Sequence, residues 1–306
     1  MHSVLRRPAV FAGMLVLTIG TVAACGSSSS GGGGGGQTIT PAATQSVDAA
    51  SRALVPADIK SRGSITVAAD ATYAPNEFLA SDGTTVIGMD ADLAKALGQV
   101  LGLTVQVKNV TFDAIIPGLV DGRYDLGMSS FTDTKAREKQ VNFVTYFNAG
   151  TSFFVKAQGG PNITGLADLC GHKVAVEAGT TQETDSKAQS TKCKNAGKPA
   201  VDVLSFQTQS EANTALASGR AEVSMADSPV AAYQVKQSNG MFKLSGQAYG
   251  TAPYGIAVPK QAGTMDQAVL SALKVLMANG TYLDILKKWG IEAGAISNPV
   301  INGAIS

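Results

Sequence analysis

Four separated segments carry hydroxyl, carboxylate or glycine residues directly after short apolar runs. Such apolar runs are typical of buried strands, and the carboxyl ends of parallel strands meet at one edge of a sheet. We therefore expect the four polar segments to converge on a small polar ligand. After residue 24 the chain has a single histidine, His172, and no Ser-His-Asp, Cys-His or metal-ligand set stands out. The polar segments are Asp70, Ser129-Ser130-Phe131-Thr132, Gly179-Thr180-Thr181-Gln182 and Ala226-Asp227-Ser228.

Short apolar strands alternate with amphipathic helices from residue 63 onward. Strand–helix alternation predicts an α/β fold with mainly parallel sheets, and two successive sets predict two lobes joined by a two-strand hinge. The lobes show no clean internal sequence repeat. The expected strands are 64–69, 103–107, 124–128, 173–176, 201–205 and 221–225. The expected helices are 92–101, 112–120, a helix from 181 onward, 210–217 and 229–237.

The first residues indicate export and a membrane anchor. Arg6 and Arg7 precede an uncharged, mostly apolar run that is too short for a confident membrane span. The run ends in Val22-Ala23-Ala24-Cys25, which resembles a bacterial lipobox. The resemblance implies a signal peptide at 1–24, cleavage before Cys25 and lipidation of Cys25. An ordinary signal peptide, with Cys25 incidental, is the alternative.

A low-complexity segment follows Cys25. Residues 26–36 are only glycine and serine, and residues 37–50 stay small and polar. Such a segment buries little apolar surface, so we expect a disordered tether over 25–62. Without the leader, 22 basic and 23 acidic side chains remain, a net charge of −1, because the leader removes two of the 24 basic residues. This balance gives no support to a nucleic-acid partner.

Two cysteines remain if Cys25 carries a lipid. Cys170 and Cys193 are an even pair in a chain expected to be exported, where disulfides persist. We expect them to form a disulfide, with two buried thiols as the alternative. No metal site and no other cofactor are expected.

Several blocks in register resemble the polar amino-acid-binding proteins of ABC importers, solute-binding family 3, with the type II periplasmic-binding fold. The resemblance runs from about Ile65 to Gly290. Met89 departs from the usual phenylalanine, and Asn76 from the more usual phenylalanine of a P-F-E-F block. The blocks are Gly88 to Leu93, Phe112 to Leu119, Gly122 to Asp125, Thr132 to Arg137, Gly179 to Gln182, Gly219 to Glu222, Tyr254 to Lys260, and Asn279 to Gly290.

The resemblance implies that Arg137 grips the α-carboxylate of an amino acid through two parallel hydrogen bonds, a geometry that lysine cannot copy. Thr132 and Thr181 would donate backbone N–H groups to the same carboxylate, with N-capping as their other role. By spacing alone, Arg137 is equally compatible with a solvent-exposed ion pair to Glu138 or Asp133.

The remaining family positions complete the expected pocket. Asp227 would be the counter-ion of the α-ammonium, with helix capping as its alternative, and Ser129 and Ser130 would lie beside it. Tyr73 and Phe112 would flank the carbon chain, although Phe112 is also a candidate core residue. The expected ligand-binding set is Asp70, Tyr73, Phe112, Ser129, Ser130, Thr132, Arg137, Thr180, Thr181, Gln182 and Asp227.

Substrate choice is expected to depend on Asp70. A carboxylate at this position holds the side-chain cation in family members for basic amino acids, and glutamine binders also carry it. We rank a basic amino acid first and glutamine second. Glu77, expected nearby, would deepen the negative field and disfavour acidic ligands.

The expected organisation places lobe 1 at 63–150 plus 254–306 and lobe 2 at 151–253. The protein would capture its ligand by hinge closure at the outer face of the cytoplasmic membrane, as a monomer, and deliver it to ABC permease subunits. Tyr254 would lie near the returning crossover strand, as a wall residue or in hinge packing. A sensory or adaptor role and a periplasmic dehydratase on the same fold are the rival functions.

Overall fold

A computed structural model describes residues 44–305 of the chain. The predicted signal peptide, Cys25 and the first part of the predicted tether lie outside these residues. The helices are α1 (Ala49–Leu54), α2 (Ala57–Arg62), α3 (Met89–Leu101), α4 (Phe112–Val120), α5 (Lys135–Glu138), α6 (Thr181–Asn195), α7 (Gln209–Ser218), α8 (Ser228–Gln237), α9 (Met265–Ala278) and α10 (Thr281–Trp289). Short 3₁₀ helices cover Leu166–Leu169 and Glu292–Gly294.

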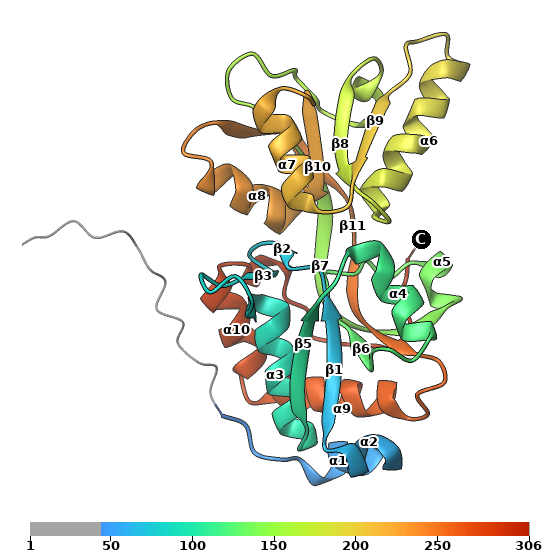
Figure 1. The fold of residues 1–306 in the computed structure, drawn as a ribbon, viewed down its shortest axis with the longest axis vertical. Helices are drawn as coiled ribbons and strands as arrows, with labels where there is room; N and C mark the ends of the chain where they lie inside the picture. The colour runs from blue at the N-terminus through green and yellow to red at the C-terminus, as the bar shows by residue number, and fades with distance from the viewer. Residues whose placement is uncertain (1–43, 306) are drawn as a thin grey trace, which may run out of the picture. The chain divides into compact units, whose positions relative to one another are not determined.

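Most strands belong to one eight-stranded sheet of order β5-β1-β6-β11-β7-β10-β8-β9, and β2-β3-β4 form a small second sheet. The main sheet joins the predicted lobes, because β7 and β11 run through both of them (Figure 1). The strands are β1 (Ser64–Ala69), β2 (Thr72–Tyr73), β3 (Glu77–Leu79), β4 (Val86–Ile87), β5 (Thr104–Asn109), β6 (Leu126–Gly127), β7 (Val141–Lys156), β8 (Lys173–Glu177), β9 (Asp202–Phe206), β10 (Val223–Asp227) and β11 (Phe242–Pro259).

The predicted α/β class with mainly parallel sheets in two lobes is confirmed. β1 pairs in parallel with β5 and β6, and β8 pairs in parallel with β9 and β10. Within the main sheet, every antiparallel pair involves β7 or β11, and the small sheet β2-β3-β4 is antiparallel throughout. The strand expected at 124–128 is shorter, at Leu126–Gly127, although the backbone N–H groups of Asp125 and Met128 still donate to the carbonyls of Thr66 and Ala68.

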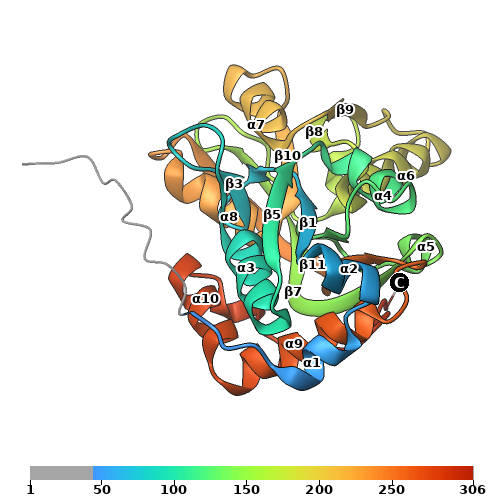
Figure 2. The same cartoon turned by 60° about the horizontal axis from the view of Figure 1, so that its bottom comes forward.

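Residues 44–62 correct the prediction of a disordered tether that reaches residue 62. They form α1 and α2, which lie beside α9 at the foot of lobe 1 (Figure 2). Asp48 caps α1 by accepting a hydrogen bond from the N–H of Ser51. Val55 and Ile59, four positions apart, are 2% and 4% exposed in the core of lobe 1. Burial of this apolar pair stabilises the folded segment, whereas the small polar residues before it have little apolar surface to bury.

Successive side chains of the lobe 2 strands point to opposite faces of the sheet, and each face has its own core. Val174 and Val176 of β8 face the core under α6, together with Val223 and Met225. Ala175, one residue along, faces the opposite core under α7. Figure 1 shows α6 on one side of these strands and α7 and α8 on the other. The period of two sends large side chains to one face and small ones to the other.

The two crossover strands are continuous rather than separate linkers. β7 and β11 pair over most of their length, with register shifts between Ser245 and Tyr249, Tyr249 and Ala252, and Tyr254 and Gly255. Bulges of this kind interrupt the ladder and increase its local twist. The irregular pairing therefore lies where the strands pass between the lobes.

No single helix within residues 44–305 has the length and apolar character needed to cross a membrane. By length and composition alone, α9 and α10 together meet that test as a pair bent by 79°. Both helices contribute buried side chains to the core of lobe 1.

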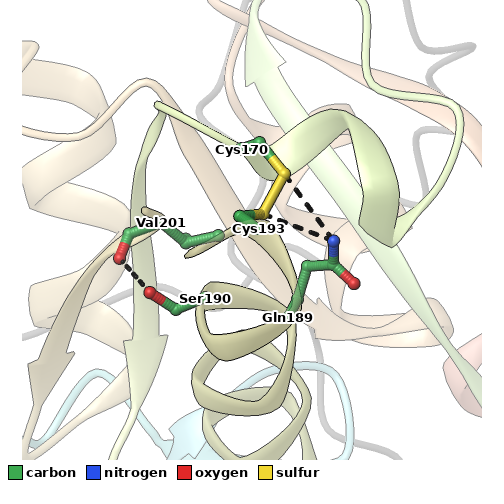
Figure 3. The surroundings of a disulfide bond; sticks show 5 residues. All are labelled: Cys170, Gln189, Ser190, Cys193 and Val201. Atoms are coloured by element: carbon green, nitrogen blue, oxygen red, sulfur yellow. Dashed lines mark hydrogen bonds between the residues drawn. A yellow bond between two sulfur atoms is a disulfide. The ribbon is translucent and has the colours of Figure 1, made fainter. Parts of the chain in front are cut away.

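The predicted disulfide is confirmed: Cys170 and Cys193 are joined, with a Cα–Cα distance of 5.7 Å (Figure 3). The bond ties α6 to the loop that precedes β8. Gln189, one turn earlier on α6, places its amide 3.4 Å from the sulfur of Cys193, and the hydroxyl of Ser190 donates to the carbonyl of Val201.

Removing this cross-link is expected to lower the free energy of unfolding by about 3 kcal/mol, because the disulfide restricts the unfolded chain. The test is urea unfolding of the Cys170→Ala/Cys193→Ala double variant. Wild-type protein in dithiothreitol should show the same loss, and dithiothreitol should not affect the double variant. Equal stability of the oxidised and reduced wild type would contradict the expectation.

Candidate functional site

One narrow cavity lies where strand ends of both lobes meet. The lining contains every ligand-binding residue expected from the sequence and one further residue, Glu177. The lining residues are Asp70, Tyr73, Phe112, Ser129, Ser130, Thr132, Arg137, Glu177, Thr180, Thr181, Gln182 and Asp227.

Arg137 reaches the cavity from the short helix α5. Its guanidinium donates to the carbonyl of Thr132 at 2.8 Å and to the carbonyl of Gly179 at 3.0 Å. It stacks over the rings of Phe112 and Phe131, each centroid 5.3 Å away. Neither Glu138 nor Asp133 forms an ion pair with it, so the surface-pair alternative is not what the structure contains. A guanidinium has five N–H donors, so donors remain for an anion.

Asp227 ends β10 in lobe 2 and is buried. Its carboxylate accepts hydrogen bonds from the amide of Gln182 at 2.7 Å and from the hydroxyl of Tyr254 at 2.7 Å. Although it stands at the N-cap of α8, its side chain makes no capping hydrogen bond. The capping alternative is therefore not realised, and the carboxylate is free to face the cavity.

Burial changes the proton affinities of this charged pair. It raises the pKa of Asp227 to about 6, although the hydrogen bonds from Tyr254 and Gln182 and the charge of Arg137 oppose the rise. Burial also lowers the pKa of Arg137 to about 10, against the attraction of Asp227. Asp227 is thus a carboxylate at neutral pH, and it becomes neutral in mildly acidic solution.

The start of α6 contributes backbone groups to the same cavity. Thr180 caps the helix by accepting from the N–H of Glu183, and Thr181 is the first helical residue. Helix N-termini favour anions, because their first N–H groups lack intrahelical partners.

Phe112 stacks on Phe131 with ring centroids 4.4 Å apart, so it is both a core residue and a wall of the cavity.

Ser129 and Ser130 line the cavity, but their hydroxyl groups are already bonded elsewhere. Both donate to the carboxyl of Glu77 at 3.1 Å. Ser130 has φ 50°, a left-handed conformation, and its N–H donates to Asp90 at 2.8 Å. We therefore assign these serines to shaping the strand end.

The position of Glu77 corrects the expectation that this residue deepens the negative field of the pocket. Glu77 is fully buried behind Ser129 and Ser130 and does not line the cavity. Burial, reinforced by the charge of Asp90, raises the pKa of Glu77 well above its usual range. A neutral Glu77 adds no negative charge to the pocket.

Asp70 projects from the end of β1, and its side chain is held in place by lobe 1. One oxygen accepts from the hydroxyl of Thr72 at 2.6 Å and the other from the N–H of Phe112 at 3.1 Å. Burial raises the pKa of Asp70, and these hydrogen bonds oppose the rise. The carboxylate is therefore fixed in direction and only 2% exposed.

Glu177 is the site residue that sequence reasoning missed. It ends β8 after the apolar run Val174-Ala175-Val176, so the argument that selected Asp70 at the end of β1 applies to it equally. The strand predicted from the sequence stops at residue 176, one residue before Glu177. Glu177 is 2% exposed, and burial together with the charge of Asp70 raises its pKa well above the usual range.

Hydrogen bonds connect the two lobes across the cavity. The hydroxyl of Tyr73 in lobe 1 accepts from the N–H of Asp227 at 3.0 Å, and the N–H of Gln209 donates to the hydroxyl of Thr72 at 3.2 Å. Arg137 makes the third link through Gly179. The structure is therefore a closed form.

Among residues 44–305, no group of three or more His, Cys, Asp and Glu side chains is placed to hold a metal ion. The cavity instead combines one cation, three carboxyl groups, a helix N-terminus and aromatic walls. Such a set is suited to binding a small zwitterion rather than to transforming it.

Comparison with known proteins gives a consistent result. Residues 65–292 match the model of the bacterial extracellular solute-binding proteins, family 3. The arginine-binding protein ArgT of Corynebacterium glutamicum is 35% identical over 254 residues, which cover 82% of each chain. An ancestral arginine-binding protein bound to arginine is similar in structure, with TM-score 0.69 and 38% identity over 75% of this chain and 99% of that chain. An ancestral arginine-binding protein bound to glutamine gives a TM-score of 0.68, with 38% identity over 75% of this chain and 99% of that chain.

Proposed function

The chain belongs to the bacterial extracellular solute-binding proteins of family 3, and on that premise we propose that it captures a basic L-amino acid by hinge closure and delivers it to an ABC permease. The observation that carries the proposal is the position of Arg137 and Asp227. They come from opposite lobes, carry opposite charges and line the same cavity.

Each end of an amino acid finds a complementary group in this cavity. Arg137, with the N–H groups of Thr132 and Thr181, is assigned to the α-carboxylate, for which a planar guanidinium is suited. Asp227 is assigned to the α-ammonium. Tyr73 and Phe112 are assigned to the carbon chain between them. The buried pair of opposite charges makes a zwitterion the best-matched ligand, because every buried charge then has a partner.

The placement of the charged groups also accounts for closure. Arg137 lies in lobe 1 and binds ligand first, whereas Asp227 and Thr181 lie in lobe 2 and contact it only when the lobes meet. A ligand that gains contacts only in the closed form shifts the population toward that form. Micromolar capture requires about −8 kcal/mol, which two desolvated charge pairs and a packed side chain can supply.

A basic side chain is ranked first because Asp70 lies beyond the zwitterion groups as a buried carboxylate. Glutamine is the second candidate, since its amide can donate to the same oxygens. The similarity to proteins named for arginine, and to a structure that holds arginine, supports this ranking. The related structure with glutamine keeps the second candidate open to test.

Location follows from the N-terminal sequence. We propose a signal peptide at 1–24, lipidation of Cys25 and attachment to the outer face of the cytoplasmic membrane, with the Gly/Ser segment 26–36 as part of the tether. The monomeric protein would present its closed lobes, 63–150 plus 254–306 and 151–253, to the permease. Helices α1 and α2 pack on lobe 1 and leave the tether shorter than the sequence alone indicated.

A thermal-shift screen of the twenty standard amino acids against the full chain tests this function. A ligand at a hundred times its Kd adds about 2.7 kcal/mol to the unfolding free energy. The melting temperature should then rise by about 5–10 °C with a basic amino acid, and less with glutamine. Absence of a shift with all twenty amino acids would refute amino-acid capture.

A further inference from the structure

Two carboxyl groups face each other from opposite lobes at one end of the cavity. Asp70 ends β1 in lobe 1, and Glu177 ends β8 in lobe 2. Both line the cavity and are 2% exposed. Each is close enough to the other to disturb its protonation, and Asp70 is the strongest charged influence on Glu177.

Their hydrogen bonding is unequal. The oxygens of Asp70 accept from Thr72 and Phe112 within lobe 1. The Oε1 atom of Glu177, by contrast, is buried and has no hydrogen-bond partner among residues 44–305. A buried polar atom without a partner costs about 1–3 kcal/mol, so it needs either a specific function or a partner that binds later.

No cation of the described chain neutralises this pair. None of the ion pairs within residues 44–305 involves Asp70 or Glu177. Arg137 is held by the carbonyls of Thr132 and Gly179, and the charges that act on it most strongly are those of Asp227, Tyr73 and Asp133. Two buried carboxylates without a cation are unfavourable. Without a cation, burial and the charge of Asp70 raise the pKa of Glu177 well above its usual range, so the pair retains a proton that a cationic ligand would replace.

We propose that Asp70 and Glu177 form a two-carboxylate clamp for a guanidinium group, so that Glu177 makes the site selective for arginine over lysine and glutamine. The inference rests on the proposed capture of an amino acid and deepens it. A guanidinium is planar, presents donors on two edges and is weakly hydrated, so it can bond one carboxylate on each side. An ammonium is compact and strongly hydrated, and an amide brings no charge.

The clamp also couples selectivity to closure. Asp70 and Glu177 come from different lobes, so a guanidinium would bridge them only when the lobes are closed. A neutral side chain would leave the two carboxyl groups facing each other. Arginine would therefore favour the closed form at both ends of the cavity, whereas glutamine would favour it chiefly through Arg137 and Asp227.

The first test compares arginine with citrulline on the full wild-type chain by calorimetry. Citrulline keeps the length and planarity of the side chain but replaces the guanidinium by a neutral urea group. We expect citrulline to bind at least about a hundredfold more weakly, because a buried charge loses its partner. Affinities within threefold of each other would overturn the clamp.

The second test uses Glu177→Gln, which keeps the shape and removes the charge. Arginine affinity should fall by about tenfold to a hundredfold, the usual value of hydrogen bonds to charged groups. Affinity for glutamine and citrulline should stay within threefold or improve. Glu222→Gln, an exposed acid of the same lobe, is the matched control and should change neither affinity. Equal losses for arginine and glutamine in Glu177→Gln would overturn the assignment.

The two proposals fail in different ways. If the wild type binds arginine, lysine and glutamine with similar affinity, amino-acid capture stands and the clamp is wrong. If the wild type binds no amino acid, capture itself is wrong. Should Glu177→Gln fold poorly, the arginine-to-citrulline ratio of the wild type still decides the question.

Discussion

Replacing Arg137 with alanine is expected to abolish amino-acid capture while the protein stays folded. The side chain supplies the only cation among the cavity-lining residues that the structure describes. Its loss would leave the ligand carboxylate buried without a counter-charge, which costs about 3–5 kcal/mol. Affinity should therefore fall by about two to four orders of magnitude. Isothermal calorimetry with the best ligand from the screen measures this directly.

A second variant at Arg137 separates the effect of its charge from that of its forked donors, and a variant of an exposed arginine is the control. Arg137→Lys keeps the charge but loses the forked donors that bond two carbonyls, so we expect partial recovery only. Arg123→Ala removes an exposed arginine that lies over Tyr124, away from the cavity, and should bind normally. The ligand-free melting temperatures and far-UV circular dichroism of all three should resemble the wild type. Unchanged affinity in Arg137→Ala would refute the assignment of the carboxylate site.

Asp227→Asn is expected to have the second largest effect, and it carries a pH signature. Asparagine is isosteric but cannot pair with the α-ammonium, so affinity should fall by about a hundredfold or more. In the wild type, the pKa of Asp227 is raised to about 6. The ionised form is the one that binds an ammonium. Affinity should thus be constant at pH 7–8 and fall as pH drops through about 6, approaching tenfold per pH unit.

The comparison of pH profiles assigns this fall to one residue. Asp227→Asn should bind weakly and show a flat profile over the same range, whereas Asp202→Asn, an exposed acid on β9, should follow the wild type. Asp133 also has its pKa raised to about 6 by burial, and burial raises those of Asp70 and Glu177. If the fall persists in Asp227→Asn, one of these groups controls binding and Asp227 does not.

Local sequence patterns were sufficient to predict the strands and helices that surround the cavity. The run 64–69 and the alternation at 173–176 became β1 and β8 because side chains with a period of two leave one face for each core. Helices 92–101 and 112–120 appeared because their apolar residues recur at helical spacing. Asp70 and Asp227 were found by the same logic, since strand ends are local features.

Other features depended on partners far away in the chain. Glu177 ends a strand, which is a local feature, but its partner Asp70 lies 107 positions earlier and meets it only in the folded protein. The serines at 129 and 130 were expected at the ligand, but buried Glu77 draws their hydroxyls away. Residues 49–62 lack a long apolar run, and they fold because α9 and α3 provide a surface for them.

The sequence by itself determined the α/β class, the strand ends that carry polar groups, the cysteine pair and the family. These depend on periodicity, composition and motif spacing, which are readable over a few residues. Tertiary structure alone decided which carboxyl groups face one another, which hydroxyls stay free and how far the folded part extends toward the N-terminus. Those outcomes follow from long-range packing, because burial and charge pairing exist only after distant segments have met.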